Sequence, residues 1–235
     1  MTRIRKAVIS AILSTVVVAT LLLVPAGLIA NQWTWSRGLW AVGVLGGGAL
    51  VAQLALAIWR PDSFDVRMQA PVARRDQRQP WLDAVGLVAY MAFLGGWCVF
   101  LPWDVFRLQL ITMPLPAISG LGLMAMIGGQ AVSYGAVWQN AFAAPTVHDQ
   151  TSDGQRVIDT GIYGVVRHPL YAGNLVTFSG LAVWLGSYAA LAGVAVMLAF
   201  TVARIGIEER ELRQRLPSYA EYARRVRARL IPNII

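Results

Sequence analysis

Long apolar stretches separated by short polar ones dominate this chain. Six stretches are candidate helices, at residues 7–30, 37–59, 81–102, 114–139, 170–186 and 189–204. Each of the first four is near or above the roughly 20 residues that a helix needs to cross a bilayer. The last two are shorter and meet at Gly186-Ser187, which predicts a tight hairpin of two short helices. We therefore predict an all-α, polytopic membrane helix bundle with about six transmembrane helices, or five as the alternative.

The composition agrees with a membrane protein. Hydrophobic residues make up 57% of the 235 residues, charged residues make up 14%, and the mean hydropathy is +0.55. These values are too apolar for an ordinary soluble domain. The single cysteine, Cys98, lies in an apolar run, which excludes an internal disulfide and argues against a structural zinc site of the Cys/His kind. We therefore expect no metal.

The positive charges predict how the spans are oriented. If the N-terminus is cytoplasmic and all six stretches cross, the inner segments hold eighteen Lys and Arg residues, and the outer loops hold only Arg37 and Arg107. The positive-inside rule describes this asymmetry. Tryptophans also lie at the predicted outer edges, as in an interfacial aromatic belt: Trp33, Trp35, Trp40 and Trp103. We predict that both termini are cytoplasmic, with a charged cytoplasmic helix at the C-terminus.

The net charge of +8 arises from residues between the apolar stretches. Anionic lipid headgroups are the nearest partners there, so we expect the lipid bilayer and no nucleic acid as the partner. The first stretch follows Arg3, Arg5 and Lys6 and resembles a signal peptide at first reading. Its length of about 24 residues exceeds a typical cleaved core, so we interpret it as a retained span.

Two further segments have a predicted structural role. Residues 60–80 form an inner loop that is long enough for a short amphipathic helix on the membrane. The stretch 114–139 is rich in small residues, which allow close helix packing in lipid. Four of them are glycines: Gly120, Gly122, Gly128 and Gly129.

The first polar cluster lies at the start of the fifth apolar stretch. Arg167 and His168 precede Pro169, which is a natural first residue of a helix. The free N–H groups at such a helix start attract an anionic group. The flanking Tyr163 and Tyr171 offer aromatic faces that attract a cation such as a sulfonium. The alternative is that Arg167 and His168 only anchor a helix end at the headgroups.

The second polar cluster follows the last apolar stretch and consists of Arg204, Glu208 and Glu209. Adjacent carboxylates beside lipid are costly unless they are paired or bound to a ligand. The hairpin that ends here is expected to bring Glu208 close to His168. The alternative is that the helix simply leaves the membrane and both carboxylates are solvated.

The chain has no motif of a soluble nucleotide-binding fold. It contains neither the glycine-rich dinucleotide fingerprint nor a Walker motif, and no zincin motif is present. We divide the chain into N-terminal transmembrane helices at 1–140 and a cofactor-binding region at 141–235, within one integrated domain.

The two polar clusters together resemble those of the isoprenylcysteine carboxyl methyltransferase and phospholipid methyltransferase superfamily of integral membrane enzymes. Residues 160–173 match its pattern T-G-x-Y-x-x-x-R-H-P-x-Y-x-G. Glu208-Glu209-x-x-Leu212, followed by Tyr219 and Tyr222, resembles its later motif. The resemblance covers residues 145–235, and one departure is Arg215-Leu216-Pro217, where the family often has Phe-Gly.

The resemblance implies S-adenosyl-L-methionine as the methyl donor, with S-adenosyl-L-homocysteine as the product. The residues that it implies for the cofactor pocket are Gln155, Arg156, Val157, Ile158, Tyr163, His168, Pro169, Leu170, Tyr171 and Glu208, with His148 as a further candidate. It implicates Arg204 with the substrate, and Arg167 is the other candidate to position the acceptor. We take Arg167, Arg204 and Glu209 as the candidate catalytic residues.

The resemblance thus implies a methyltransferase with a lipophilic acceptor that enters laterally from the bilayer. An isoprenylcysteine-type carboxylate is the favoured acceptor, and a phospholipid amine or a small thiol is the alternative. Two readings of another class remain: a transporter, and a membrane protein that kept the fold without activity. The absence of a detectable inverted repeat argues against the transporter.

Overall fold

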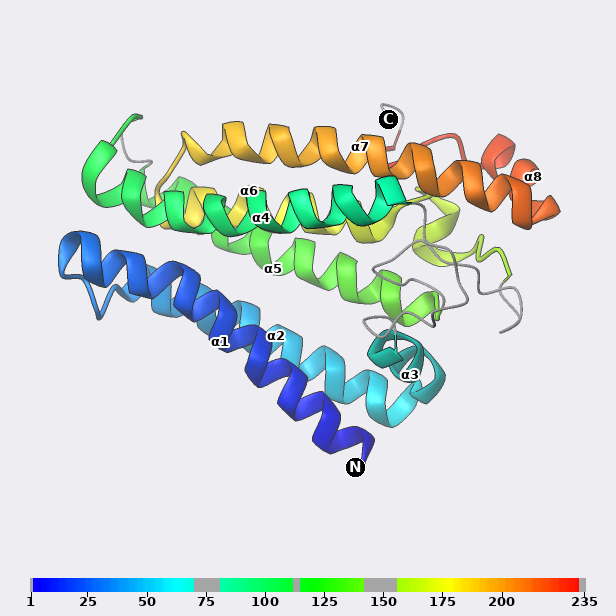
Figure 1. Ribbon diagram of the computed structural model, residues 1–235, viewed down its shortest axis with the longest axis horizontal. Coiled ribbons are helices and arrows are strands. Elements are labelled where there is room, and N and C mark those ends of the chain that lie inside the picture. The colour runs from blue at the N-terminus through cyan, green and yellow to red at the C-terminus, as the bar shows by residue number, and fades with distance from the viewer. Residues whose placement is uncertain (1, 70–80, 112–114, 142–155, 233–235) are drawn as a thin grey trace.

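The computed structural model describes residues 2–69, 81–111, 115–141 and 156–232, and within these ranges the regular elements are all helical (Figure 1). The helices are α1 (Arg3–Ala30), α2 (Ser36–Trp59), α3 (Pro61–Gln69), α4 (Trp81–Trp103), α5 (Pro116–Gln139), α6 (Pro169–Leu185), α7 (Ala190–Arg215) and α8 (Pro217–Arg225). A π-helical turn, η1 (Asp104–Leu108), continues α4, and a 3-10 turn, η3 (Gly161–Gly164), precedes α6. The prediction of an all-α helix bundle is confirmed.

Among the described residues, five helices are long and apolar enough to cross a membrane: α1, α2, α4 with η1, α5 and α7. The predicted pair of short helices is wrong for α7, which has 26 residues and continues through the charged sequence to Arg215. An ion pair between Arg215 and Glu211, at 2.7 Å, supports this extension. Helix α6 has 17 residues, or about 25 Å, and is an apolar sixth helix shorter than a full span.

The helices lie in two groups that diverge toward one end (Figure 1). The hairpin of α1 and α2 is one group, and α4, α5, α6 and α7 form the other. The N-terminal end of α1, the short α3, the C-terminal end of α7 and α8 all lie at this diverging end. The charged ends of the helices therefore share one side of the bundle, as predicted. Its assignment to the cytoplasm stays a prediction.

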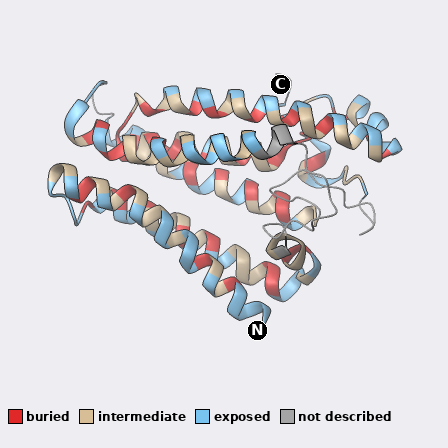
Figure 2. Cartoon of the chain, in the orientation of Figure 1, coloured by how far each residue is buried: buried red, intermediate tan, exposed pale blue. Residues whose placement is uncertain are grey.

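Exposed residues lie on the outward faces of the helices, and buried residues line their facing sides (Figure 2). Many of the exposed residues are large and apolar. Leu28, Val51 and Met124 are 73%, 69% and 62% exposed. Exposing this much apolar surface to water would be unfavourable, whereas the hydrocarbon core of a bilayer accommodates it. The chain is an integral membrane protein.

Glycines bring α5 and α6 into close contact, which is the most extensive helix contact in the bundle. An added Cβ at Gly122 or Gly129 would lie 2.6 or 2.5 Å from backbone nitrogens of α6. The packing prediction is therefore confirmed for these two residues. It is wrong for Gly120 and Gly128, where an added Cβ would meet nothing within 4 Å.

Of the four tryptophans predicted at the outer edges of the belt, Trp33, Trp40 and Trp103 are exposed. Trp35 is instead buried, and its ring packs edge-on against Phe106 with 5.1 Å between the centroids. The belt prediction is therefore wrong for Trp35, because the π-helical turn covers it.

Candidate active site

The loop before α6 has a defined local structure. Gly161 has a φ of +60°, a conformation that favours glycine, and the next N–H, of Ile162, donates a hydrogen bond of 2.9 Å to Oε1 of Gln139. Pro169 is the first residue of α6, as predicted, and His168 occupies the preceding cap position. Gly161 and Pro169 thus define the backbone at the two ends of this loop, and the polar side chains between them have defined positions.

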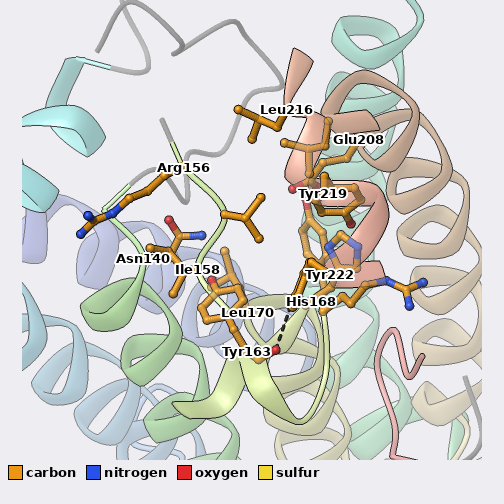
Figure 3. A pocket seen from close by; sticks show the side chains of 14 residues that line it. Asn140, Arg156, Ile158, Tyr163, His168, Leu170, Glu208, Leu216, Tyr219 and Tyr222 are labelled. Atoms are coloured by element: carbon orange, nitrogen blue, oxygen red, sulfur yellow. Dashed lines mark hydrogen bonds between the residues drawn. The ribbon is translucent and has the colours of Figure 1, made fainter. Parts of the chain in front are cut away.

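A cleft lies at the charged end of the bundle. Figure 3 shows Asn140 and Arg156 on one side of it, and Glu208, Tyr219 and His168 on the opposite side. Nine of the residues predicted from the sequence line this cleft: Arg156, Val157, Ile158, Tyr163, Arg167, His168, Leu170, Tyr171 and Glu208. The structure therefore brings together two segments that are about 40 residues apart in the sequence.

The other predicted residues lie elsewhere. Pro169 is buried and is not among the residues that line the cleft. Arg204 lines a neighbouring cavity, and Glu209 lies behind the cleft wall. His148 and Gln155 lie outside the described residues.

Glu209 is the centre of a buried ionic cluster. Its Oε1 accepts a hydrogen bond of 2.8 Å from Nε of Arg167 and lies 3.2 Å from Nε2 of His168. All three residues are less than 10% exposed. Arg229 adds a contact of 3.4 Å to Oε2 of Glu209. A buried carboxylate needs such partners. Because Glu209 is on α7, its contacts with Arg167 and His168 join α7 to the loop before α6.

The same arginine also fastens the C-terminal tail to this loop. Nη1 of Arg167 donates hydrogen bonds of 2.6 and 2.7 Å to the carbonyls of Val226 and Arg227. The backbone N–H groups of Arg167 and His168 donate to the carbonyls of residues 228 and 229, each at 2.9 Å. The geometry of Arg167 is therefore that of a residue that positions the cleft wall.

A second polar chain connects the cleft to its neighbour. The Tyr171 hydroxyl donates a 2.8 Å hydrogen bond to Oε2 of Glu208 and accepts one of 2.9 Å from Nε of Arg204. The carboxylate beside His168 is therefore that of Glu209, and Glu208 contacts Tyr171. Neighbouring residues point about 100° apart around a helix, so the two carboxylates serve different sites.

The neighbouring cavity, which we call the apolar chamber, measures about 550 Å³, against about 90 Å³ for the cleft. It is lined by residues of α2 to α7, and most of its lining is apolar. Its charged lining residues, in the described part of the chain, are Arg67 and Arg204. Leu170 and Tyr171 line both the chamber and the cleft, so the two cavities adjoin at the start of α6.

Sequence reasoning missed five residues of the cleft: Asn140, Leu212, Leu216, Tyr219 and Tyr222. Leu212 and Leu216 follow Glu208 at intervals of four, so helical periodicity extended past Arg204 would have found them. The tyrosines belong to the quoted motif, but no role was predicted for them. No comparable sequence pattern points to Asn140.

Potential metal ligands are scattered in the part of the chain that the structure describes. In the described ranges, no group of three or more His, Cys, Asp or Glu side chains is close enough to hold an ion.

Burial favours the neutral form of a phenol in the cleft. It raises the pKa of Tyr163 to about 12, so this side chain is protonated at neutral pH. The cleft thus presents phenols, the carboxylate of Glu208, the side chains of Arg156 and Arg167, and apolar walls.

Two comparisons with known proteins bear on this site. The cobalt-zinc-cadmium resistance protein CzcN of Cupriavidus metallidurans is 31% identical over 106 residues, which are 45% of this chain and 46% of that protein. The chain therefore matches about half the length of this relative. The model of the phospholipid methyltransferase family matches residues 118–218. This range runs from α5 to the start of α8 and includes both polar clusters. The resemblance inferred from the sequence is thus confirmed for residues 118–218, which match the model of the phospholipid methyltransferase family.

Proposed function

We propose that this chain is a membrane methyltransferase that takes a methyl group from S-adenosyl-L-methionine and esterifies the carboxylate of a lipophilic acid. The main support is the junction at Leu170 and Tyr171, which line both cavities. A polar ligand in the cleft and an apolar ligand in the chamber would meet there. Methyl transfer requires such a meeting, because the reacting atoms must be aligned and shielded from water.

The side chains of the cleft fit the proposed methyl donor. Tyr163 and Tyr222 supply aromatic rings, and Ile158 and Leu216 supply apolar surface for a nucleoside. Glu208 can accept hydrogen bonds from hydroxyl or ammonium groups. When bound, S-adenosylmethionine supplies an electrophilic methyl group on a sulfonium, whose positive charge is attracted by aromatic faces and carboxylates.

The chamber favours an acid as the acceptor. Its two charged lining residues, Arg67 and Arg204, are cations, and each can pair with a carboxylate. An amine acceptor would be repelled while protonated and would need a base to remove its proton. A carboxylate is already ionised at neutral pH. Because the remaining lining is largely apolar, the acceptor is expected to be a long-chain acid of the isoprenylcysteine type.

The hydrogen bonds that join Glu208, Tyr171 and Arg204 support a role for each of these residues. Arg204 binds the carboxylate of the acceptor, and Tyr171 holds the guanidinium in place through its 2.9 Å hydrogen bond. Glu208 fixes the Tyr171 hydroxyl from the cleft side at 2.8 Å. Arg167 and Glu209 act by holding the cleft wall. No general base is required, since the acceptor is already an anion.

The product of the reaction distinguishes the candidate acceptors. We expect the purified protein to transfer a labelled methyl group from S-adenosylmethionine to lipophilic carboxylic acids, such as an S-farnesyl cysteine derivative. The label should be released as volatile methanol by mild base, because only a methyl ester is hydrolysed under these conditions. A base-stable labelled product from amine or thiol acceptors, with none from acids, would overturn the carboxylate assignment.

Filling the chamber tests where the acceptor binds. Gly86 on α4 lines the chamber, and an added Cβ there meets nothing within 4 Å. We expect Gly86→Phe to reduce kcat/KM for a long-chain acceptor about tenfold or more, since the ring occupies the volume of several methylene groups. Binding of S-adenosylhomocysteine should be unchanged.

Gly96 on the same helix is the matched control. It also has nothing within 4 Å of an added Cβ, and it does not line the chamber. Gly96→Phe should therefore leave kcat/KM unchanged. Wild-type kcat/KM in both variants would show that the acceptor binds elsewhere.

A further inference from the structure

One hydroxyl group in the cleft has no hydrogen-bond partner in the described structure. Tyr219 is only 4% exposed, and its phenolic oxygen is one of three buried side-chain atoms of this kind, with Oε1 of Gln53 and Oγ of Ser119. Of these three residues, only Tyr219 lines the cleft. Burying a hydroxyl without a partner is unfavourable, so a buried unpaired hydroxyl beside a cleft calls for a partner that the protein itself does not supply.

The ring of Tyr219 is held in position by its surroundings. Helix α8 begins at Pro217, and the backbone N–H of Tyr219 donates a 2.9 Å hydrogen bond to the carbonyl of Leu216. The ring packs edge-on against Tyr222, with 5.7 Å between the centroids. Leu216, Tyr222 and Val226 form the buried cluster around it. The ring of Tyr219 therefore occupies a fixed place among the residues that line the cleft (Figure 3).

The chemical state of this hydroxyl is also defined. Burial, with the negative charges of Glu209 and Glu208 nearby, raises the pKa of Tyr219. The phenol is therefore protonated at neutral pH and can donate one hydrogen bond. A suitable partner is an acceptor atom of a ligand in the cleft, such as a hydroxyl oxygen, a carboxylate oxygen or a ring nitrogen.

We propose that the hydroxyl of Tyr219 donates a hydrogen bond to the S-adenosyl cofactor and contributes to its affinity. This inference rests on the proposed function, which places the cofactor in the cleft. It adds a binding residue on α8 to those implied by the resemblance. It also gives α8 a polar contact with the cofactor, in addition to the aromatic ring of Tyr222.

The neighbouring tyrosine offers a matched control. The hydroxyl of Tyr222 donates a 2.8 Å hydrogen bond to the backbone carbonyl of Tyr163, so its partner is part of the protein. Tyr222 is as buried as Tyr219, at 4% exposure for each, and also lines the cleft. The same substitution at the two positions removes a ligand contact in one variant and an internal contact in the other.

The test is calorimetric titration of S-adenosylhomocysteine into the wild-type protein, Tyr219→Phe and Tyr222→Phe in nanodiscs, together with the Tm of each free protein. Loss of one neutral hydrogen bond should weaken binding to Tyr219→Phe about three- to tenfold. Its Tm should be unchanged or higher, since no internal partner is lost. Tyr222→Phe should lower the Tm, because the Tyr163 carbonyl loses its donor.

The outcomes separate this inference from the proposed function. Wild-type affinity in Tyr219→Phe, with binding to the wild-type protein intact, would overturn the role of Tyr219 and leave the cofactor assignment standing. A lower Tm of Tyr219→Phe with unchanged affinity would equally overturn it, because the hydroxyl would then have a structural role. Failure of the folded wild-type protein to bind would overturn the proposed function and this inference together.

Discussion

Replacing Glu209 with alanine is expected to lower the Tm of the purified protein by about 10 °C or more. The carboxylate lies 2.8 Å from Nε of Arg167, and both side chains are 5% exposed. Its removal leaves the Arg167 guanidinium buried without its counter-ion, a change that typically costs about 3–5 kcal/mol. The loop before α6 and the tail at residues 226–229 would lose their common anchor. Binding of S-adenosylhomocysteine should weaken as a consequence.

The control for this prediction is Glu211 on the same helix. Glu211 pairs with Arg215 at 2.7 Å, but the two side chains are 23% and 24% exposed. Exposed ion pairs contribute little, so Glu211→Ala should change the Tm by less than about 2 °C. Thermal unfolding in detergent, followed by circular dichroism, measures both variants. Equal Tm values for the two would contradict the role of the Glu209 cluster.

Replacing Arg204 with alanine is expected to reduce kcat/KM for a lipophilic acid about a hundredfold or more. Arg204 is half-buried and lines the apolar chamber, most of whose other lining is apolar. A charge-assisted pair with the carboxylate of the acceptor is strong in such surroundings. Arg204→Lys keeps the charge but loses the planar, two-pronged geometry, so its activity should be intermediate.

The cofactor titration distinguishes this role from a structural one. Arg204 does not line the cleft, so the affinity for S-adenosylhomocysteine should stay within about twofold of the wild-type value in Arg204→Ala. The defect should appear in the transfer of labelled methyl groups to the acid. Unchanged transfer by Arg204→Ala would show that the acceptor carboxylate is bound by another residue.

The pattern of apolar stretches predicted most helix positions, because in lipid a spanning helix must be long and apolar. It ended the last apolar helix at residue 204, whereas the charged sequence that follows, which is itself helix-prone, continues the same helix as the C-terminal half of α7. Residues 205–215 are too polar for a span, yet ion pairs along the helix continue it to Arg215. The start of α6 was predictable from Pro169, since proline fits the first helical turn.

The roles of the two adjacent glutamates were not predictable from the sequence. Hairpin geometry predicted Glu208 beside His168, whereas Glu209 contacts His168 in the structure and Glu208 contacts Tyr171. Which carboxylate turns toward His168 depends on the rotation of α7 about its axis, which packing against α4 and α6 sets. The partners of Glu209 also include the C-terminal tail through Arg229, a contact between segments that no local pattern encodes. The apolar chamber is likewise a product of helix arrangement.

Calorimetric titration of S-adenosylhomocysteine into the wild-type protein in nanodiscs tests the central claim most directly, because every proposed role assumes a cofactor in the cleft. We predict saturable binding at one site per chain. A control titration with adenosine monophosphate, a nucleotide without the homocysteine group, should give much weaker binding. Absence of S-adenosylhomocysteine binding in a sample with a cooperative thermal transition would contradict the account.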